Sequence, residues 1–162
     1  MNSPANSPAS FVLLQLGGRR FALDAGIVTE LAPPVRLHTF PHTSPILSGV
    51  IVRRSHIVPV YDASTILVGK RSSVHRFYLI ARREFGQTSE LVAIPVDGEC
   101  ELSSGEMMPA QPGQPAYIKG RLTVGDEIID VLDFDSVVTQ TPADTARAKA
   151  SDDAAGHAEV LA

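Results

Sequence analysis

Short apolar runs separated by turn residues follow one another along most of this chain. The runs FVLLQL (Phe11–Leu16) and RFAL (Arg20–Leu23) flank Gly17-Gly18, a pattern typical of a β-hairpin with a tight two-residue turn. Three later pairs of runs repeat this pattern: SGVIV with IVPVY around residues 53–56, RFYLIA with LVAIPV around a longer polar loop, and AYIKGRLTV with EIIDVL around Gly125-Asp126. The segment AGIVTELA (Ala25–Ala32) fits either a helical turn or a strand. The pattern predicts a mainly β protein with a few short helices.

The second half of the chain repeats the first. SGVIVRRSHIVPVYDASTIL (Ser48–Leu67) and KGRLTVGDEIIDVLDFDSVV (Lys119–Val138) align from end to end without a gap, so that Ser48 corresponds to Lys119. We call this alignment the repeat register. Phe11–Leu14 instead aligns with Phe77–Ile80, and the distance along the chain between these two segments is five residues shorter than in the repeat register. We therefore expect the first hairpin loop of the second copy to be five residues longer than its counterpart.

Two copies of a four-to-five-strand unit are best explained as two small β-barrels that share one core. Neither half, at about 65 residues, would bury much apolar surface alone. We expect the folded body at residues 11–139. A disordered lead at residues 1–10, which repeats NSPA, should precede it, and an alanine- and aspartate-rich flexible tail at residues 140–162 should follow it.

Asp62 and Asp133 occupy equivalent places in the repeat. Each ends a predicted strand and precedes a short apolar-periodic segment, ASTILV in the first copy and FDSVV in the second. An aspartate at this place is expected to cap the first helical turn by accepting hydrogen bonds from its free N–H groups. A catalytic carboxylate is the weaker interpretation, because no partner acid or base recurs beside either residue.

Composition and charge narrow the classes of function. Hydrophobic residues make up 44% and charged residues 20% of the 162 residues, enough for a packed core. A net charge of −4 gives neither the basic footprint of a nucleic-acid-binding protein nor a polybasic membrane anchor. No apolar run approaches the roughly 20 residues that cross a bilayer, and MNSPANSPAS does not resemble a secretory signal. Since Cys100 is the single cysteine, we predict a cytoplasmic protein without an intramolecular disulfide.

The residue types most often used in catalysis form no recognisable constellation in this sequence. His38 and His42 have a metal-like spacing, but they lie in a proline-containing loop without a nearby cysteine or carboxylate. Ser55 and His56 are neighbours on a strand, so their side chains point to opposite faces and cannot complete a hydrolase triad. Cys100 lies between two glutamates, which should raise the pKa of its thiol. We predict no enzyme activity, no cofactor and no metal; an enzyme with His56 as a lone base is the remaining alternative.

The surface chemistry of the first copy is more informative. Val50, Ile51 and Val52 form a continuous apolar run, so both faces of this strand are expected to meet apolar groups. The run ends in Arg53 and Arg54, whose guanidinium groups can pair with carboxylates of a partner in a bidentate way. For Arg53, simple solvation of a hairpin tip is an equal alternative. The second copy has no arginine at the corresponding turn.

Taken together, the segments resemble the CheW-like domain, found in the bacterial chemotaxis coupling protein CheW and in the regulatory domain of the histidine kinase CheA. The resemblance is carried, in order, by ALDAGIVTEL (Ala22–Leu31), GVIVRRSHIVPVYDAS (Gly49–Ser64), PVDGECEL (Pro95–Leu102) and the second copy of the repeat. No single motif is decisive, but their joint order and spacing are specific. The resemblance covers about Phe11 to Val138.

This resemblance implies two pseudo-symmetric, five-stranded SH3-like β-barrels around a hydrophobic core. It also implies a non-catalytic adaptor that couples methyl-accepting chemotaxis receptors to a CheA-type kinase. A groove near the first barrel would receive the tip of the receptor's helical hairpin, and another face would dock the kinase's regulatory domain. The positions that match the receptor side are Val28, Glu30, Gly49 and Arg54, with Arg53 as a further candidate contact. The protein would reach the membrane only through its receptors.

The predicted hairpin at Arg54 departs from the family pattern. Val52 stands for an asparagine, Arg53 for a leucine and Ser55 for a glycine. Losing the asparagine and the glycine should alter the turn geometry. A second function therefore stays open: a CheW-like binding module of a non-flagellar pathway, such as pilus-based motility, or of another signalling complex with a different partner.

Overall fold

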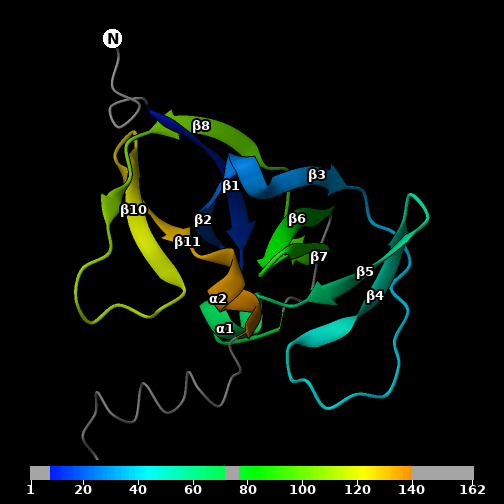
Figure 1. The fold of residues 1–162 in the computed structure, drawn as a ribbon. Coiled ribbons are helices and arrows are strands. Elements are labelled where there is room, and N and C mark those ends of the chain that lie inside the picture. The colour runs from blue at the N-terminus through cyan, green and yellow to red at the C-terminus, as the bar shows by residue number, and fades with distance from the viewer. Residues whose placement is uncertain (1–7, 72–76, 140–162) are drawn as a thin grey trace, which may run out of the picture.

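The computed structural model describes residues 8–71 and 77–139, which form two curved β-sheets lying side by side (Figure 1). The elements in chain order are β1 (Ala9–Leu16), β2 (Arg19–Asp24), the 3-10 helix η2 (Ala25–Ile27), β3 (Val28–Ala32), β4 (Leu47–Arg53), β5 (His56–Tyr61), α1 (Ser64–Leu67), β6 (Phe77–Phe85), β7 (Thr88–Val96), β8 (Glu101–Gly105), β9 (Met108–Pro109), β10 (Ile118–Val124), β11 (Glu127–Leu132) and α2 (Phe134–Thr139). Strands dominate and the helices are short, which confirms the predicted fold class.

The two sheets have related strand orders. The first barrel is the six-stranded sheet β8-β1-β2-β11-β10-β9, and the second barrel is the five-stranded sheet β3-β6-β7-β5-β4. The sixth strand of the first barrel is the short β9, which pairs with β10. Each barrel contains one parallel pair, β2 with β11 in the first and β7 with β5 in the second, and the other pairs are antiparallel.

Each barrel is built from both copies of the sequence repeat. The hairpin β1–β2, from the N-terminal half, joins β10–β11 from the C-terminal half, and the hairpin β6–β7 joins β3, β4 and β5. The two halves thus exchange a hairpin, so neither barrel is complete with the strands of one half. This exchange makes the two barrels a single folding unit.

The register of strand pairing repeats between the barrels. Ile51 of β4 pairs with Val58 of β5, and at the matching positions of the second copy Leu122 of β10 pairs with Ile129 of β11. Each of these hairpins also has a register shift at the corresponding place, at residues 47–49 and 118–120. The predicted repeat register is therefore confirmed at the level of backbone pairing.

For the first strand of each copy, the predicted alignment is wrong by one position. Phe11 and Leu13 point into the interior of the first barrel, whereas Tyr78 and Ile80 take that role in the second barrel. Phe11 therefore corresponds to Tyr78 and not to Phe77. A shift of one residue in a strand moves every side chain to the opposite face. The alignment of two phenylalanines was misleading for this reason.

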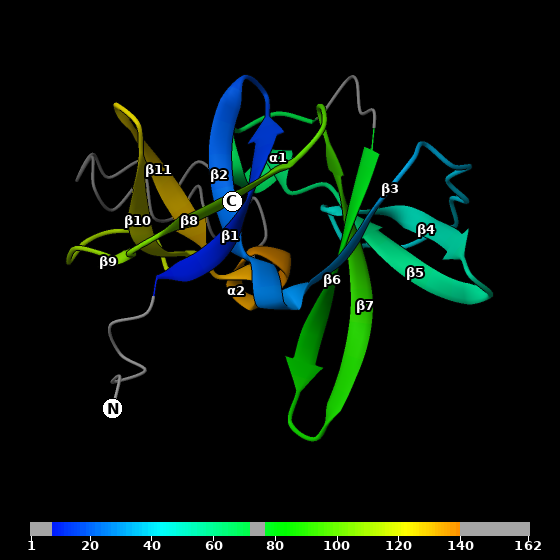
Figure 2. The same ribbon diagram turned by 90° about the horizontal axis from the view of Figure 1, so that it is seen from above.

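The predicted long polar loop between RFYLIA and LVAIPV is also wrong. Pairing between β6 and β7 continues to Phe85 and Thr88, which leaves a two-residue turn like the one between β1 and β2. The additional residues of the second copy lengthen the two strands instead, and the hairpin projects beyond the barrel (Figure 2). Charged residues occur along this hairpin: Arg83 lies 3.5 Å from Glu90 across the strand pair and donates a hydrogen bond of 2.9 Å to Asp135 of α2. No apolar alternation marks the outer part of the hairpin as a strand.

Three apolar clusters hold the fold together. The first barrel encloses Phe11, Leu13, Ala22, Leu122, Ile129 and Val131; the second encloses Ala32, Ile51, Val58, Val60, Tyr78, Ile80 and Ala93. A larger cluster lies between the barrels and includes Leu14 and Phe21 from the first, Leu79 and Ile94 from the second, and side chains of α1 and α2. Figure 1 shows both helices at the centre, between the sheets. The predicted shared core is this third cluster.

The start of the folded body differs slightly from the prediction. Ala9 and Ser10, expected in a disordered lead, belong to β1 and pair with Gly105 and Ser104 of β8. Residues 1–7 of that lead and the predicted tail at residues 140–162 lie outside the described residues. Within the described ranges, no helix is long and apolar enough to span a membrane.

Candidate functional site

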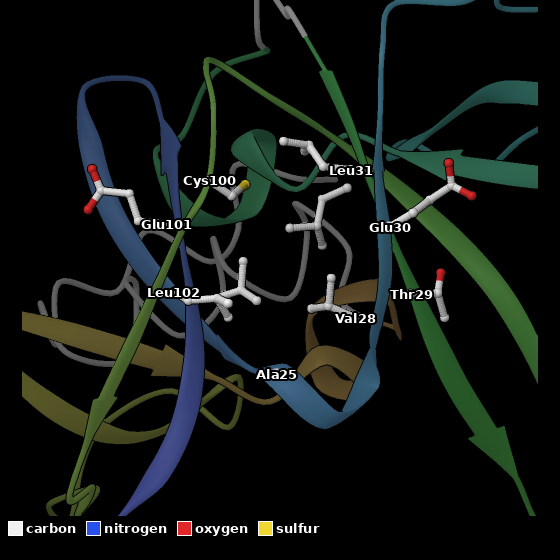
Figure 3. A pocket seen from close by; sticks show the side chains of 10 residues that line it. Ala25, Val28, Thr29, Glu30, Leu31, Cys100, Glu101 and Leu102 are labelled. Carbon is white, nitrogen blue, oxygen red and sulfur yellow. The ribbon is translucent and has the colours of Figure 1, made fainter.

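A groove of about 270 Å³ opens between the two barrels. Strand β3 forms one wall and β8, with the residue before it, forms the other (Figure 3). Val28 and Leu31 point from β3 toward Cys100 and Leu102 on the opposite side. Because these walls are largely apolar, the groove suits a row of apolar side chains from another molecule.

The walls of the groove are related by the sequence repeat. The repeat register matches Leu31 with Leu102 and Glu30 with Glu101. The two glutamates stand at opposite rims and point away from each other (Figure 3). The groove therefore lies where the two copies meet, with equivalent strand positions on its two walls.

On the β3 rim, one carboxylate binds two guanidinium groups. The Nε of Arg53 donates to Oε1 of Glu30 over 2.8 Å, and the Nε of Arg54 donates to Oε2 over 3.2 Å. The hydrogen bond from Arg53 is the largest contribution that holds the pKa of Glu30 below its usual value. Arg53 is half-buried, while 76% of the Arg54 side chain is exposed. This rim has one more positive than negative charge.

On the β8 rim, one guanidinium group lies between two carboxylates. Nη1 of Arg20 donates to Oε2 of Glu127 over 2.7 Å, and Nη2 of Arg20 lies 3.4 Å from Oε2 of Glu101. Glu101 and Glu127 are 72% and 47% exposed. This rim has one more negative than positive charge, the reverse of the β3 rim.

Arg54 and Ser55 form the two-residue turn between β4 and β5. Both have positive φ angles, 51° and 66°, a conformation that glycine adopts far more easily. At the equivalent turn of the second copy, Gly125 takes the place of Arg54 with a φ of 60°. Arg54 and Ser55 thus keep a left-handed backbone in a turn of two residues although neither is glycine, and the predicted change in turn geometry stays a prediction.

The structure brings three of the five predicted partner-binding residues into one cluster. Glu30, Arg53 and Arg54 are in contact, and Val28 lines the groove beside them. Gly49 does not line the groove. Its φ is 151°, and a Cβ atom there would collide with the carbonyl oxygen of His38, whose backbone pairs with that of the residue after Gly49. The structure thus gives Gly49 a role in close backbone packing.

Asp62 and Asp133 accept hydrogen bonds at the starts of the two helices. Oδ1 of Asp62 accepts from the backbone N–H of Ser64, over 3.2 Å, and from the Ser64 hydroxyl. Oδ1 of Asp133 accepts from the N–H of Ser136 over 3.3 Å. These contacts stabilise the first turns of α1 and α2, and each carboxylate lies just before the helix that it contacts.

The remaining candidate residues do not assemble into a reactive site. His38, His42 and His56 are all exposed, and the described ranges contain no group of three or more His, Cys, Asp or Glu side chains that could hold a metal ion. Burial raises the pKa of the Cys100 thiol to about 11, so the thiol is protonated at neutral pH. The direction agrees with the prediction, but the cause is burial in the groove wall and not the neighbouring glutamates.

Sequence reasoning missed the β8 wall. Leu102 is 78% exposed at the groove, and Glu101 carries the charge of its rim. The signal was present, because the repeat register maps Glu30 and Leu31 onto Glu101 and Leu102. The segment ELSSG was not recognised because it has little apolar alternation and pairs with β1 along one edge.

Comparisons with known proteins give a family and a fold. A family model described as the CheW-like domain matches residues 10–141. The fold is similar to the crystal structure of scaffolding protein TtCheW from Thermoanaerobacter tengcongensis, with a TM-score of 0.68 and 19% sequence identity over 85% of this chain and 92% of that chain. A comparison with curated protein sequences gives no match.

Proposed function

Because the chain belongs to the family of CheW-like domains, we propose that it is a non-catalytic adaptor of bacterial chemosensory signalling. In this role it couples methyl-accepting receptors to a CheA-type histidine kinase in the cytoplasm. It reaches the membrane only by binding receptors, and it requires neither a cofactor nor a metal.

The observation that carries the proposal is the apolar groove between the barrels. Helices commonly bind other proteins by laying an apolar stripe into such a groove while charged residues flank the stripe. Val28 and Leu31 on one wall and Leu102 on the other supply the apolar surface, and Glu30 with Arg54 supplies charge at the rim. The tip of a receptor's helical hairpin has the shape and chemistry that this groove would accept.

A second protein contact is supported on the outer face of the second barrel. Val52 and Ile57 pair across β4 and β5 and are 54% and 73% exposed. Contiguous exposed apolar side chains on a soluble domain commonly mark a protein interface. We propose this face for the homologous regulatory domain of the kinase, which leaves the groove free for the receptor.

The chemistry of the groove also favours binding over catalysis. Its carboxylate Glu30 is held by two arginines, and its thiol Cys100 is protonated at neutral pH. A general base or nucleophile requires a free, activated group beside a partner that orients it. These groups instead shape and charge a surface.

The proposal predicts which variants lose the receptor. We expect Arg54→Ala and Leu102→Asp to weaken binding of a soluble receptor hairpin tip about tenfold, because Leu102 is exposed in the groove and Arg54 is exposed at its rim beside Glu30. Ile128→Asp serves as the control, since Ile128 is 65% exposed on β11 and does not line the groove. Titration calorimetry gives the affinities, and thermal melts should show similar midpoints for all variants. Normal binding by both groove variants would contradict the proposed receptor surface.

Arg53 stands where the family pattern has a leucine, and this substitution favours one alternative function with a different binding partner. A CheW-like binding module of a pilus-based or other signalling pathway would keep the fold but bind a different protein at this charged rim. A pull-down of the full chain from its native lysate separates the two functions. Enrichment of both a CheA-type kinase and a methyl-accepting receptor supports the coupling adaptor, whereas recovery of neither supports the alternative.

A further inference from the structure

The two rims of the groove differ in charge although the strands that form them occupy equivalent positions in the repeat. The difference is encoded at four pairs of positions that the repeat relates: Arg53 with Val124, Arg54 with Gly125, His56 with Glu127, and Arg20 with Leu91. The β3 rim has two arginines around one glutamate, all from the first copy. The β8 rim has two glutamates from the second copy around Arg20, which the first copy supplies through the exchanged hairpin. The groove lies between two copies of one unit, yet it has a surplus positive charge at the β3 rim and a surplus negative charge at the β8 rim.

A symmetric groove would accept a helix in two orientations related by the approximate twofold axis. Charges at the rims remove this ambiguity, because like charges placed opposite each other are strongly unfavourable. We propose that the surplus charges select one orientation of a partner helix that carries a carboxylate on the flank facing Arg54 and a basic side chain on the flank facing Glu101. This inference rests on the proposed function, since the partner is taken to be the receptor hairpin.

Arg53 and Arg54 contact Glu30 in different ways, which gives them different roles. Arg53, half-buried, makes the shorter contact with Glu30, 2.8 Å against 3.2 Å for Arg54. Arg54 uses its Nε for Glu30, and within residues 8–71 and 77–139 its two terminal nitrogens have no hydrogen-bond partner. That free edge of the guanidinium can bind a carboxylate in a bidentate way. Arg53 neutralises Glu30 and so leaves Arg54 available.

On the opposite rim, Glu101 is the matching exposed group. Its contact with Nη2 of Arg20 is long, 3.4 Å, whereas Nη1 of Arg20 makes a short hydrogen bond of 2.7 Å with Glu127. Glu101 is 72% exposed and therefore reachable by a lysine or arginine of the partner. Since exposed pairs are individually weak, the effect on orientation depends on both rims acting together.

The experiment measures binding of the full chain to a soluble receptor hairpin tip at about 50 mM and about 300 mM NaCl, where screening lengths differ. We expect Arg54→Glu and Glu101→Lys each to weaken binding about tenfold at low salt, with a smaller loss at high salt. Lys70→Glu and Glu84→Lys are the matched controls, because they change the net charge equally at exposed positions that do not line the groove. Circular dichroism verifies that each variant is folded.

A charge swap on the partner tests the orientation itself. A single acidic-to-lysine change beside the apolar stripe of the hairpin should restore binding to Arg54→Glu and leave Glu101→Lys weak. Rescue of both variants by the same change, or wild-type affinity of both variants, would overturn the inference while leaving the adaptor function intact. Failure of the wild-type chain to bind any receptor tip would instead refute the proposed function.

Discussion

At the scale of single residues, Arg54 combines an unfavourable backbone with a charged surface role. Its φ of 51° lies in the left-handed region, where a side chain costs about 1–2 kcal/mol relative to glycine. The equivalent turn of the second copy uses Gly125 and has no rim arginine. A strained conformation of this kind supports a hypothesis of function, and we therefore propose that the Arg54 side chain is needed at this turn.

This strain leads to a stability prediction. Ser55→Gly should raise the free energy of unfolding by about 1 kcal/mol, because Ser55 also has a positive φ and glycine removes the steric cost. Arg54→Gly should give a similar gain, reduced slightly by the loss of an exposed ion pair, but it should lose receptor binding. Urea unfolding measures the first effect and calorimetry the second. Unchanged or lower stability for Ser55→Gly would contradict the argument.

The charged cluster also shows how far residue-level prediction from sequence reaches. Glu30, Arg53 and Arg54 were all candidates, but their mutual contact was not expected because Glu30 lies on β3 and the arginines lie at the tip of β4–β5. A sequence pattern places side chains on a face of one element. Which two elements then meet depends on the tertiary fold. The opposite charges of the two rims therefore could not be predicted from the sequence and are seen only in the structure.

At the scale of elements, glycines mark where a neighbouring segment crosses a hairpin at close range. A Cβ atom on Gly49 would collide with the carbonyl oxygen of His38, and one on Gly120 would lie 2.5 Å from the carbonyl oxygen of Met108. Both glycines directly follow the register shift in their hairpins. The repeat thus preserves a packing constraint as well as a pattern of apolar residues.

This packing predicts the effect of a minimal substitution. Gly49→Ala should lower the free energy of unfolding by about 2–4 kcal/mol, because the obstructing atom is backbone and the φ of 151° is strained for alanine. Gly98→Ala is the control, since nothing lies within 4 Å of its Cβ position, and it should change stability by less than about 0.5 kcal/mol. Urea denaturation compares them. Equal stability of the two variants would refute the packing role of Gly49.

Elements were predictable where apolar alternation was strong and were missed elsewhere. The hairpins β1–β2, β4–β5 and β10–β11 were expected at nearly their observed bounds. The outer part of β6–β7 was taken for a loop because it is rich in charged residues and lies outside any core. Strands β8 and β9 were not expected, since they are short and pair along one side with β1 and with β10.

At the scale of the whole molecule, the sequence repeat predicted two related barrels around a common core, and the structure has them. The exchange of hairpins between the copies was not predictable in the same way. Local patterns specify that β1–β2 is a hairpin, but its partners β10–β11 come from the opposite end of the folded body. This exchange places β3 of one barrel beside β8 of the other and so creates the groove.

The central claim is that this groove, and not an outer face of either barrel, receives the receptor. Hydrogen–deuterium exchange of the full chain, with and without a soluble receptor hairpin tip, tests it most directly. The account predicts slower exchange in β3, in β8 and at the β4–β5 turn, with little change in the projecting β6–β7 hairpin. Slower exchange confined to β10–β11 or to the β6–β7 extension, with β3 and β8 unaffected, would contradict it.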